Sequence, residues 1–219
     1  MIVKKMPILQ GFPDFETVKK LTKSYVLSEH FVPVFYDIET TGLSRNSTFL
    51  YLAGAVAYEE KNWQMYQWMI EDETEEPELL KIFSEFLQNF SCTIQYNGDS
   101  FDQPYLEARY QIHGLPSPFE SLPSLDLYRE LKPVKGLLKL SRMNQPSMEA
   151  FLGITERTYC DGGACIRLYK QFASGKKPEA DEILMGHNQE DLFGLGKIIS
   201  MLSYLTPVSY THLTLPTIA

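Results

Sequence analysis

Residues 35–43 read FYDIETTGL, and the interpretation of the whole chain starts from this stretch. The apolar, β-forming residues that lead into it predict a strand over residues 33–40. Two acids, Asp37 and Glu39, lie one residue apart near the end of that strand. Because side chains alternate faces along a strand, both acids point to one side and Ile38 to the other. Unpaired buried charge is expensive, so the pair predicts either a partner of opposite charge or exposure to solvent.

A metal ion is one partner that suits two adjacent carboxylates. Like charges this close raise each other's pKa unless a cation neutralises them. Carboxylate oxygens with few other ligand types favour a hard divalent ion such as Mg²⁺ or Mn²⁺. A single Asp-x-Glu at a strand end is better explained by plain solvent exposure, so the metal interpretation depends on finding further acids.

Composition sets broad limits on the class of protein. The 219 residues are 44% hydrophobic and 22% charged, which is ordinary for one soluble globular domain. No apolar run reaches the roughly 20 residues that span a bilayer, and the N-terminus lacks a secretory signal pattern, so we expect a cytoplasmic protein without a membrane anchor. The chain has three cysteines, Cys92, Cys160 and Cys165, and no two of them have CxxC spacing. This odd number without a metal or redox motif predicts reduced side chains.

The net charge of -8 argues, taken alone, against a nonspecific binder of polyanions. It does not exclude a nucleic-acid enzyme, because acidic metal ligands contribute to that total and bound metals reverse the local sign.

The order of predicted elements indicates a mixed α/β fold. Residues 1–30 read as an irregular lead-in with one short helix over 14–23. The rest predicts a five-stranded mixed sheet flanked by helices, with its first three strands antiparallel. The predicted strands are 33–40, one from Phe49, 63–70, one from Cys92, and one near Leu125 that runs into a helix. The predicted long helices follow Pro77, Phe101 and Ala180, and the acids over 71–78 are explained as a solvated helix N-terminus.

The end of the chain is excluded from functional reasoning. Residues 208–217 read VSYTHLTLPT, and back-translation resembles a transposase adaptor used in preparing sequencing libraries. We therefore interpret residues 207–219 as an adaptor-derived tail, expect the natural protein to continue differently, and do not count His212 as a ligand.

A third acid lies at another predicted strand end. In YNGDSFDQPYL (96–106), Asp102 begins a helix just past a strand, with Asn97 closing the strand and Phe101 available to anchor the turn. Open α/β sheets build their sites at the carboxyl ends of strands, so Asp102 is placed to meet Asp37 and Glu39. Asp99, on the same loop, is better explained as a turn residue.

HNQED (187–191) supplies the fourth acid. His187 and Asp191 are four residues apart and share one face of a helix, whose buried stripe faces the sheet. Glu190 lies about 100° away from Asp191 around the helix and is the weaker candidate. A lone histidine on a helix is more often a surface residue, so its role rests on the surrounding acids.

Taken together, DIETTGL, YNGDSFDQPYL and HNQED resemble the three exonuclease motifs of the DEDD group of the ribonuclease-H-like superfamily, which includes proofreading 3′ to 5′ exonucleases. The chain looks most like the YprB-like ribonuclease-H-like proteins of bacteria. The resemblance spans about residues 31–206, and it implies a ribonuclease-H-like domain that hydrolyses phosphodiester bonds of DNA or RNA. The implied substrate is the 3′ end of a single strand.

The resemblance also implies roles for individual residues. Asp37, Glu39, Asp102 and Asp191 would bind two divalent ions, Mg²⁺ or Mn²⁺, with Asp37 bridging, and His187 would be the general base. His187 lies four residues before Asp191, which is the spacing of the tyrosine subgroup of DEDD proteins. In the histidine subgroup, the base usually lies five residues before the last Asp. Substrate contacts are implied for Thr40, Leu43, Asn97 and Phe101, whereas a structural turn explains Thr41 equally well.

One basic stretch stands out in an acidic protein. YRELKPVKGLLKLSR (128–142) carries five cations against Glu130, which suits either a path for phosphates or a solvated helix face. The five are Arg129, Lys132, Lys135, Lys139 and Arg142. Asp126, just before this stretch, is explained as a structural residue at a strand end.

Two other classes of function stay open at this point. An Asp-nucleophile phosphatase also begins with acids two apart after an apolar strand, but it needs a second Asp where Glu39 stands. A catalytically silent nucleic-acid-binding or scaffold module is compatible with the fold, although the presence of all four acids argues against it.

Overall fold

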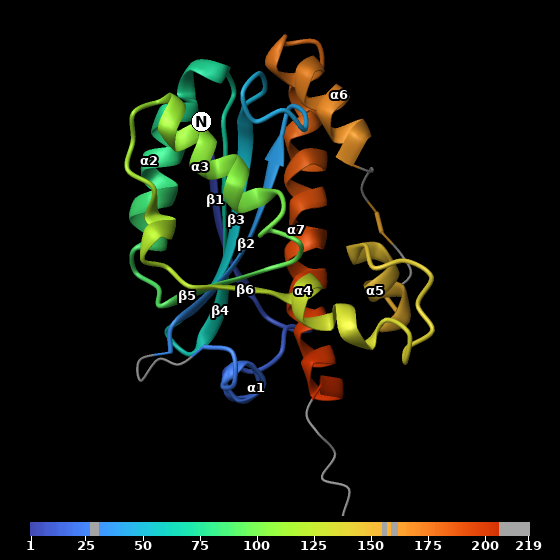
Figure 1. The fold of residues 1–219 in the computed structure, drawn as a ribbon. Helices are drawn as coiled ribbons and strands as arrows, with labels where there is room; N and C mark the ends of the chain where they lie inside the picture. Colours follow the sequence, from blue (N-terminus) through green and yellow to red (C-terminus); the bar gives the residue numbers. More distant parts are fainter. Residues whose placement is uncertain (27–30, 155–156, 159–161, 206–219) are drawn as a thin grey trace, which may run out of the picture.

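The molecule is built on a mixed sheet of six strands in the order β1-β4-β3-β2-β5-β6, which confirms the predicted α/β class (Figure 1). The computed structural model describes residues 1–26, 31–154, 157–158 and 162–205, so the predictions for residues 207–219, His212 and Cys160 lie outside the described residues. The pairs β1–β4, β4–β3 and β3–β2 are antiparallel, whereas β2–β5 and β5–β6 are parallel. The strands are β1 (Ile2–Ile8), β2 (Pro33–Thr40), β3 (Leu50–Glu59), β4 (Asn62–Met69), β5 (Cys92–Gln95) and β6 (Ser124–Asp126).

Strand β1 corrects the prediction of an irregular lead-in and raises the strand count from five to six. It pairs antiparallel with β4 along the edge of the sheet, from Ile2 opposite Met69 to Ile8 opposite Trp63. Its sequence, IVKKMPI, carries two lysines and Pro7, which obscure the apolar alternation. Both residue types are common on edge strands, because proline lacks a donor and lysine discourages pairing with other chains.

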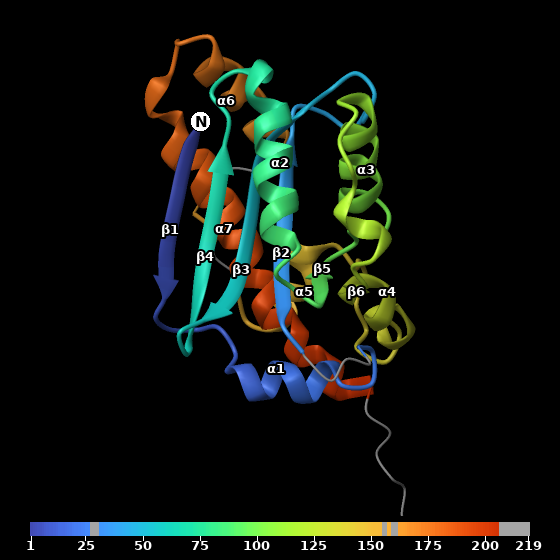
Figure 2. The same cartoon turned by 90° about the vertical axis from the view of Figure 1, so that its left-hand side faces the viewer.

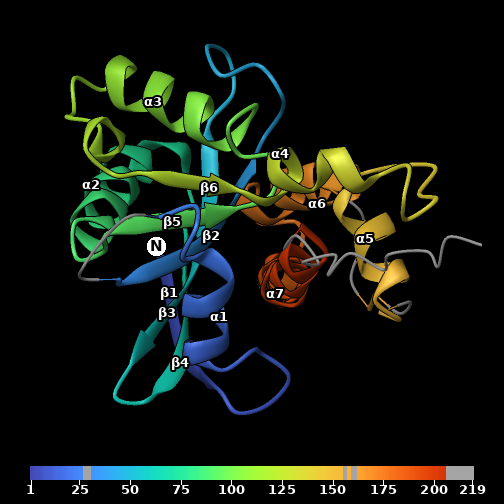
Figure 3. The same cartoon turned by 60° about the horizontal axis from the view of Figure 1, so that its bottom comes forward.

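Helices cover both faces of the sheet (Figures 2 and 3). Helices α2 and α3 lie on one face, and α7 lies on the other. The helices are α1 (Phe15–Thr22), α2 (Glu76–Leu87), α3 (Asp102–Ile112), α4 (Leu127–Leu131), α5 (Gln145–Phe151), α6 (Gly162–Ala173) and α7 (Asp181–Ile198). Single 3₁₀ turns are η1 (Glu73–Glu75), η2 (Pro118–Glu120), η3 (Lys132–Val134) and η4 (Pro178–Ala180), and a longer 3₁₀ segment, η5 (Ile199–Leu205), extends α7. None of the helices in the described ranges is both long and apolar enough to cross a membrane.

The two sides of β2 belong to two different core clusters. Val34, Tyr36 and Ile38 pack with the residues of α2 and α3, whereas Phe35 packs with those of α7 and η5. This alternation confirms the strand geometry inferred from the sequence. It also means that the odd-numbered side chains of β2, which include both acids of the first motif, face α7.

The acidic stretch before α2 is only partly solvated, contrary to the prediction. Glu76 is 1% exposed, and its Oε1 accepts hydrogen bonds from the Leu50 amide and Arg109 Nε, both at 2.8 Å. His113 Nε2 lies 2.8 Å from the other carboxylate oxygen. This buried ion pair ties α2 to β3 and α3, so Glu76 has a structural role.

Candidate active site

Three elements bring the four predicted acids to one place. Asp37 and Glu39 come from β2, Asp102 is the first residue of α3, and Asp191 lies on α7. The charges of Asp191, Asp102 and Glu39 all raise the pKa of Asp37, so the four carboxyl groups lie within range of one another's charge. The strand alternation, the β5-to-α3 loop and the face of α7 bring them there.

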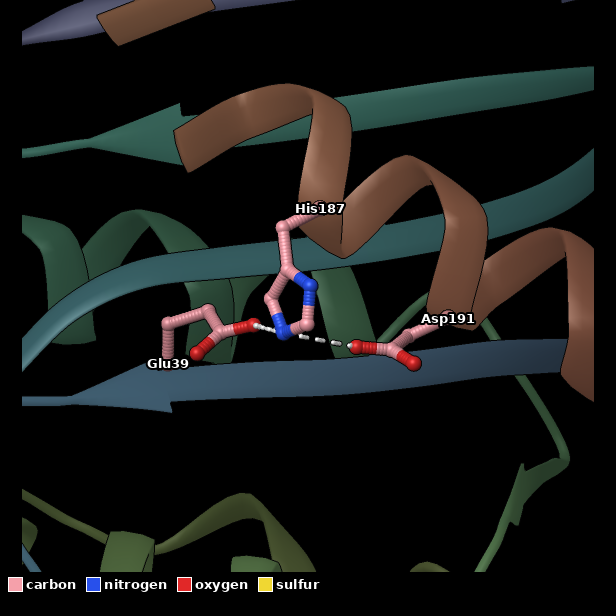
Figure 4. A group of neighbouring side chains, drawn as sticks. All are labelled: Glu39, His187 and Asp191. Carbon is pink, nitrogen blue, oxygen red and sulfur yellow. Dashed lines mark ion pairs between the residues drawn. The ribbon is translucent and has the colours of Figure 1, made fainter. Parts of the chain in front are cut away.

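His187 lies between two of these acids (Figure 4). Its Nε2 is 3.2 Å from Asp191 Oδ2 and 3.4 Å from Glu39 Oε1. Ligand atoms of all three residues lie within 4.8 Å of one another. His187 is 6% exposed, and its Nδ1 has no hydrogen-bond partner among the described residues. The four-residue spacing to Asp191 thus aims the ring's Nε2 into the acidic cluster.

Burial and mutual repulsion make the carboxylates poor acids in the absence of a cation. Burial is the main reason that the pKa values of Asp37 and Glu39 lie well above the ordinary value, and the charge of Asp191 adds to both. Burial also raises the pKa of Asp102 to about 7, although backbone amides of Asp102 and Ile38 oppose the shift. A group of carboxylates in this state is stabilised by positive charge.

An amide network that sequence reasoning missed holds Asp37 in place. Asn188 Nδ2 donates to Asp37 Oδ2 at 2.8 Å, and Asn188 Oδ1 accepts from Gln67 Nε2 at 2.9 Å. Gln67 Nε2 also donates to the Met185 carbonyl at 2.8 Å. Both amides are fully buried, so the network is a fixed part of the core. The sequence contained one signal for this network. A glutamine lies on the inward face of β4, between two methionines of the same face, where an apolar residue is expected.

Gly54 allows α7 to come this close to the sheet. It lies opposite Asp37 in the β2–β3 register. A Cβ atom at this position would lie 2.0 Å from Asn188 Oδ1 and 2.8 Å from a Leu192 methyl carbon. Only glycine therefore permits the contact between the Asn188 amide and the strand.

A second polar group, also missed from the sequence, supports Asp191 from the other side. Arg157 Nη1 lies 2.7 Å from Asp191 Oδ1, and the same guanidinium binds Glu149, which is 2% exposed, with two hydrogen bonds of 2.9 and 2.8 Å. Gln145 Nε2 donates to the Asp191 carbonyl at 2.7 Å. Arg157 is thus a cation inside the acidic site, and its charge opposes the rise in the Glu39 pKa.

The residues predicted to contact substrate lie in two separate places. Leu43 is 83% exposed and, with Phe101, lines a pocket of about 390 Å³ between the end of β2 and the start of α3. Asn97 lines a different pocket, beside Tyr128. Thr40 is nearly buried and donates to the Gly42 carbonyl at 2.9 Å, which gives it a contact within its own turn. Thr41 bonds the backbone of Phe49, in agreement with a structural turn.

The weaker acidic candidates have other partners. Asp99 binds Arg129, Gln95 and Ser124, so it is a loop residue, as predicted. Asp126 accepts hydrogen bonds from backbone amides that include that of Asn97 at 2.8 Å, which confirms its structural role. Glu190 accepts from the Thr158 amide at 2.7 Å and is not a member of the group formed by Glu39, His187 and Asp191.

The donor set fits hard divalent cations. Four carboxylates converge with one histidine and one arginine, so oxygen ligands predominate and negative charge is in excess. The raised pKa values of Asp37 and Glu39 express that excess. Oxygen-rich sites of this kind suit Mg²⁺ or Mn²⁺ better than metals that prefer sulfur or nitrogen.

Comparisons with known proteins agree with the fold. A family model described as the RNase_H superfamily matches residues 34–203. The family B DNA polymerase of the hyperthermophilic archaeon Pyrobaculum calidifontis is similar in structure with a TM-score of 0.64 and 17% identity, over 80% of this chain and 25% of that one. The zinc-bound complex of E. coli ExoI with single-stranded DNA is similar with a TM-score of 0.54 and 10% identity, over 82% of this chain and 42% of that one. This chain therefore spans less than half of either structure, and no curated protein matches its sequence.

Proposed function

Because the chain belongs to the RNase H superfamily, we propose that it is a metal-dependent 3′ to 5′ exonuclease acting on single-stranded DNA or RNA. The observation that carries the proposal is the convergence of Asp37, Glu39, Asp102 and Asp191 into one cluster, in which Glu39 and Asp102 are buried and the charges repel each other. Buried carboxylates that repel each other are expensive to maintain, and a function that needs them explains why they are there. The similarity to ExoI and to a DNA polymerase concerns the fold and agrees with a nucleic-acid substrate.

The four carboxylates would hold two divalent ions, Mg²⁺ or Mn²⁺. When bound, such ions supply positive charge to the phosphate and activate a water molecule for attack. The chain's own contribution is to keep the carboxylates in place: Asn188 donates to Asp37 Oδ2, and Gln145 donates to the Asp191 carbonyl. Glu39 and Asp102 are each 9% exposed, whereas Asp37 and Asp191 are half-buried. Electrostatic interactions are strengthened at the two buried acids, and the other two stay within reach of solvent and substrate.

His187 would act as the general base. Its Nε2 is the ring nitrogen that faces the acids, and in the neutral ring this atom can accept the proton of the attacking water. Asp191, at 3.2 Å, would stabilise the imidazolium that results. The ring is placed correctly because it lies one helical turn before Asp191 on α7.

The pocket lined by Leu43 and Phe101 would hold the terminal nucleotide. It is open to solvent, and it is bounded by the turn after Glu39 and by the residue before Asp102. An apolar side chain and an aromatic ring at this place suit a base without selecting its sequence. The pocket is too small for a duplex and is compatible with one unpaired 3′ end.

The test is a cleavage assay on 5′-labelled single-stranded DNA and RNA with Mn²⁺ or Mg²⁺. We expect a ladder that shortens from the 3′ end and no cleavage of a circular single strand. Asp37→Asn should abolish the ladder, and His187→Ala should slow it by about 10²- to 10⁴-fold, the range for loss of a general base. Asp99→Asn is the matched control, because it removes a nearby acid that lies outside the cluster.

Three results would assign another function. Metal-dependent cutting of the circular strand would indicate an endonuclease. Release of phosphate from small monoesters, without cleavage of either polymer, would indicate the phosphatase. Strand binding without cleavage under any metal would indicate a silent binding or scaffold module.

A further inference from the structure

We propose that a second pocket binds the part of the nucleic-acid strand that lies on the 5′ side of the scissile phosphate. This lysine–tyrosine pocket is defined by Tyr96, Asn97, Tyr128, Lys132, Lys135 and Gln145. It has a volume of about 520 Å³, larger than the 390 Å³ of the pocket at Leu43 and Phe101. The inference rests on the proposed function, because it assigns the remainder of the same substrate.

The lysine–tyrosine pocket adjoins the acidic cluster directly. Gln145 lines the pocket, and its Nε2 donates to the Asp191 carbonyl at 2.7 Å. Asn97 lines it too, and this residue lies on the loop that leads from β5 to Asp102. The pocket is therefore linked to Asp191 through the Gln145 side chain and to Asp102 through a short loop.

Two lysines give the pocket its charge. Within the basic stretch, Arg129 is already engaged by Asp99 and Glu130. Lys132 and Lys135 are exposed, and in the part of the chain that the structure describes no acidic side chain forms an ion pair with either. Lys132 begins the 3₁₀ turn η3 and Lys135 follows it, and residues three apart in such a turn point to the same side. Both ammonium groups are thus available to phosphates of one strand.

Two tyrosines give the pocket an aromatic wall. The rings of Tyr96 and Tyr128 meet edge to face at a centroid distance of 5.9 Å and an angle of 77°. The Tyr96 hydroxyl donates to the Met143 carbonyl at 2.5 Å, which fixes this ring and leaves half-buried Tyr128 as the partner that can stack on a base. Free lysines beside a tyrosine that can stack are the combination that binds single-stranded nucleic acid.

The two pockets share no lining residue, and each adjoins a different predicted metal ligand. Phe101 of the first pocket precedes Asp102, and Gln145 of the second donates to the Asp191 carbonyl. In the proposed arrangement the terminal nucleotide lies at Leu43 and Phe101, the scissile phosphate lies at the acids, and the rest of the strand continues past Gln145 into the lysine–tyrosine pocket.

The test compares two double substitutions that remove the same charge. Lys132→Gln with Lys135→Gln changes the pocket, whereas Lys139→Gln with Arg142→Gln changes the same basic stretch outside it. Binding of a labelled single-stranded oligonucleotide is followed by fluorescence anisotropy with Ca²⁺ in place of the catalytic metal. We expect the pocket variant to lose about tenfold in affinity and the control less than about threefold. Each phosphate contact to a single strand contributes about 0.7 to the slope of log affinity against log salt. The pocket variant lacks two lysines, so the magnitude of its slope should be smaller by about 1.4.

A stacking substitution and a short substrate complete the test. Tyr128→Ala should weaken binding by about fivefold or more, and Tyr128→Phe should restore it. Cleavage of a dinucleotide, which has no phosphate beyond the scissile one, should stay within about threefold of wild type in the lysine pocket variant. The pocket assignment would be overturned if both double variants lost the same affinity for the oligonucleotide, or if neither lost any. It would also be overturned if the wild type did not bind the oligonucleotide. Binding that depends on the pocket without any cleavage would instead refute the exonuclease proposal and leave the pocket in place.

Discussion

Replacing Asp102 by asparagine should stabilise the metal-free protein, although the same change should abolish metal-dependent activity. Asp102 is 9% exposed and its burial raises its pKa from 3.8 to about 7. Asparagine has the same shape and carries no charge, so it removes the cost of an ionised carboxylate at this place. A residue that improves stability when it is neutralised is typical of a functional site.

The size and pH dependence of this effect follow from the shifted pKa. Because the folded-state pKa is above the unfolded value, the folded state binds the proton more tightly, and wild-type stability falls as the pH rises from about 4 to about 7. Each pKa unit is worth about 1.4 kcal/mol. The Asp102 charge therefore costs about 4 kcal/mol at about pH 8 and about 2 kcal/mol at about pH 5, and Asp102→Asn should recover these amounts.

Urea unfolding with a chelator present measures the difference directly. We expect the midpoint of Asp102→Asn to lie above that of the wild type at about pH 8, with a smaller gap at about pH 5. Glu182→Gln serves as the control, because this exposed acid on α7 lies outside the cluster. A less stable Asp102→Asn at about pH 8, or a gain that is equal at both pH values, would refute the electrostatic reasoning.

Three further substitutions probe the support of the acidic cluster. Gly54→Ala places a Cβ 2.0 Å from Asn188 Oδ1, so it should displace α7, destabilise the protein by about 1–3 kcal/mol in urea unfolding, and abolish cleavage. Asn188→Asp keeps the shape but sets a carboxylate against Asp37, and we expect a loss of about 2 kcal/mol that shrinks at low pH. Arg157→Gln removes the cation 2.7 Å from Asp191, so calorimetry should show Mn²⁺ binding about fivefold more tightly, equivalent to about 1 kcal/mol.

Each of these three predictions can be contradicted by a specific result. An active Gly54→Ala would mean that α7 does not depend on close contact with β3. Asn188→Asp with wild-type stability at every pH would show that the amide does not restrain Asp37. Weaker Mn²⁺ binding by Arg157→Gln would show that the guanidinium orients Asp191 more than it competes with the metal.

The parts of the site that local patterns control could be predicted from the sequence. Strand alternation alone places Asp37 and Glu39 on one face, and helix periodicity alone places His187 beside Asp191. The structure agrees, with Ile38 in the opposite core cluster and His187 Nε2 at 3.2 Å from Asp191. These inferences needed no knowledge of how distant segments pack.

The missed features depend on packing between distant segments. Gln67 and Asn188 are 121 positions apart and become partners only when β4 and α7 meet. Arg157 belongs to no periodic pattern, so nothing in its neighbourhood indicates that it reaches Asp191. Strand β1 was missed because an edge strand is half exposed, and its lysines and proline hide the alternation that reveals central strands.

Anomalous X-ray diffraction from crystals grown with Mn²⁺ and a nucleoside 5′-monophosphate tests the central claim most directly. The account predicts two Mn²⁺ ions bound by the carboxylates of Asp37, Glu39, Asp102 and Asp191, with His187 outside the coordination spheres. No Mn²⁺ at these carboxylates would contradict it. A single ion held by Glu39, Asp191 and the His187 ring nitrogen would contradict both the two-ion site and the role of His187 as the base.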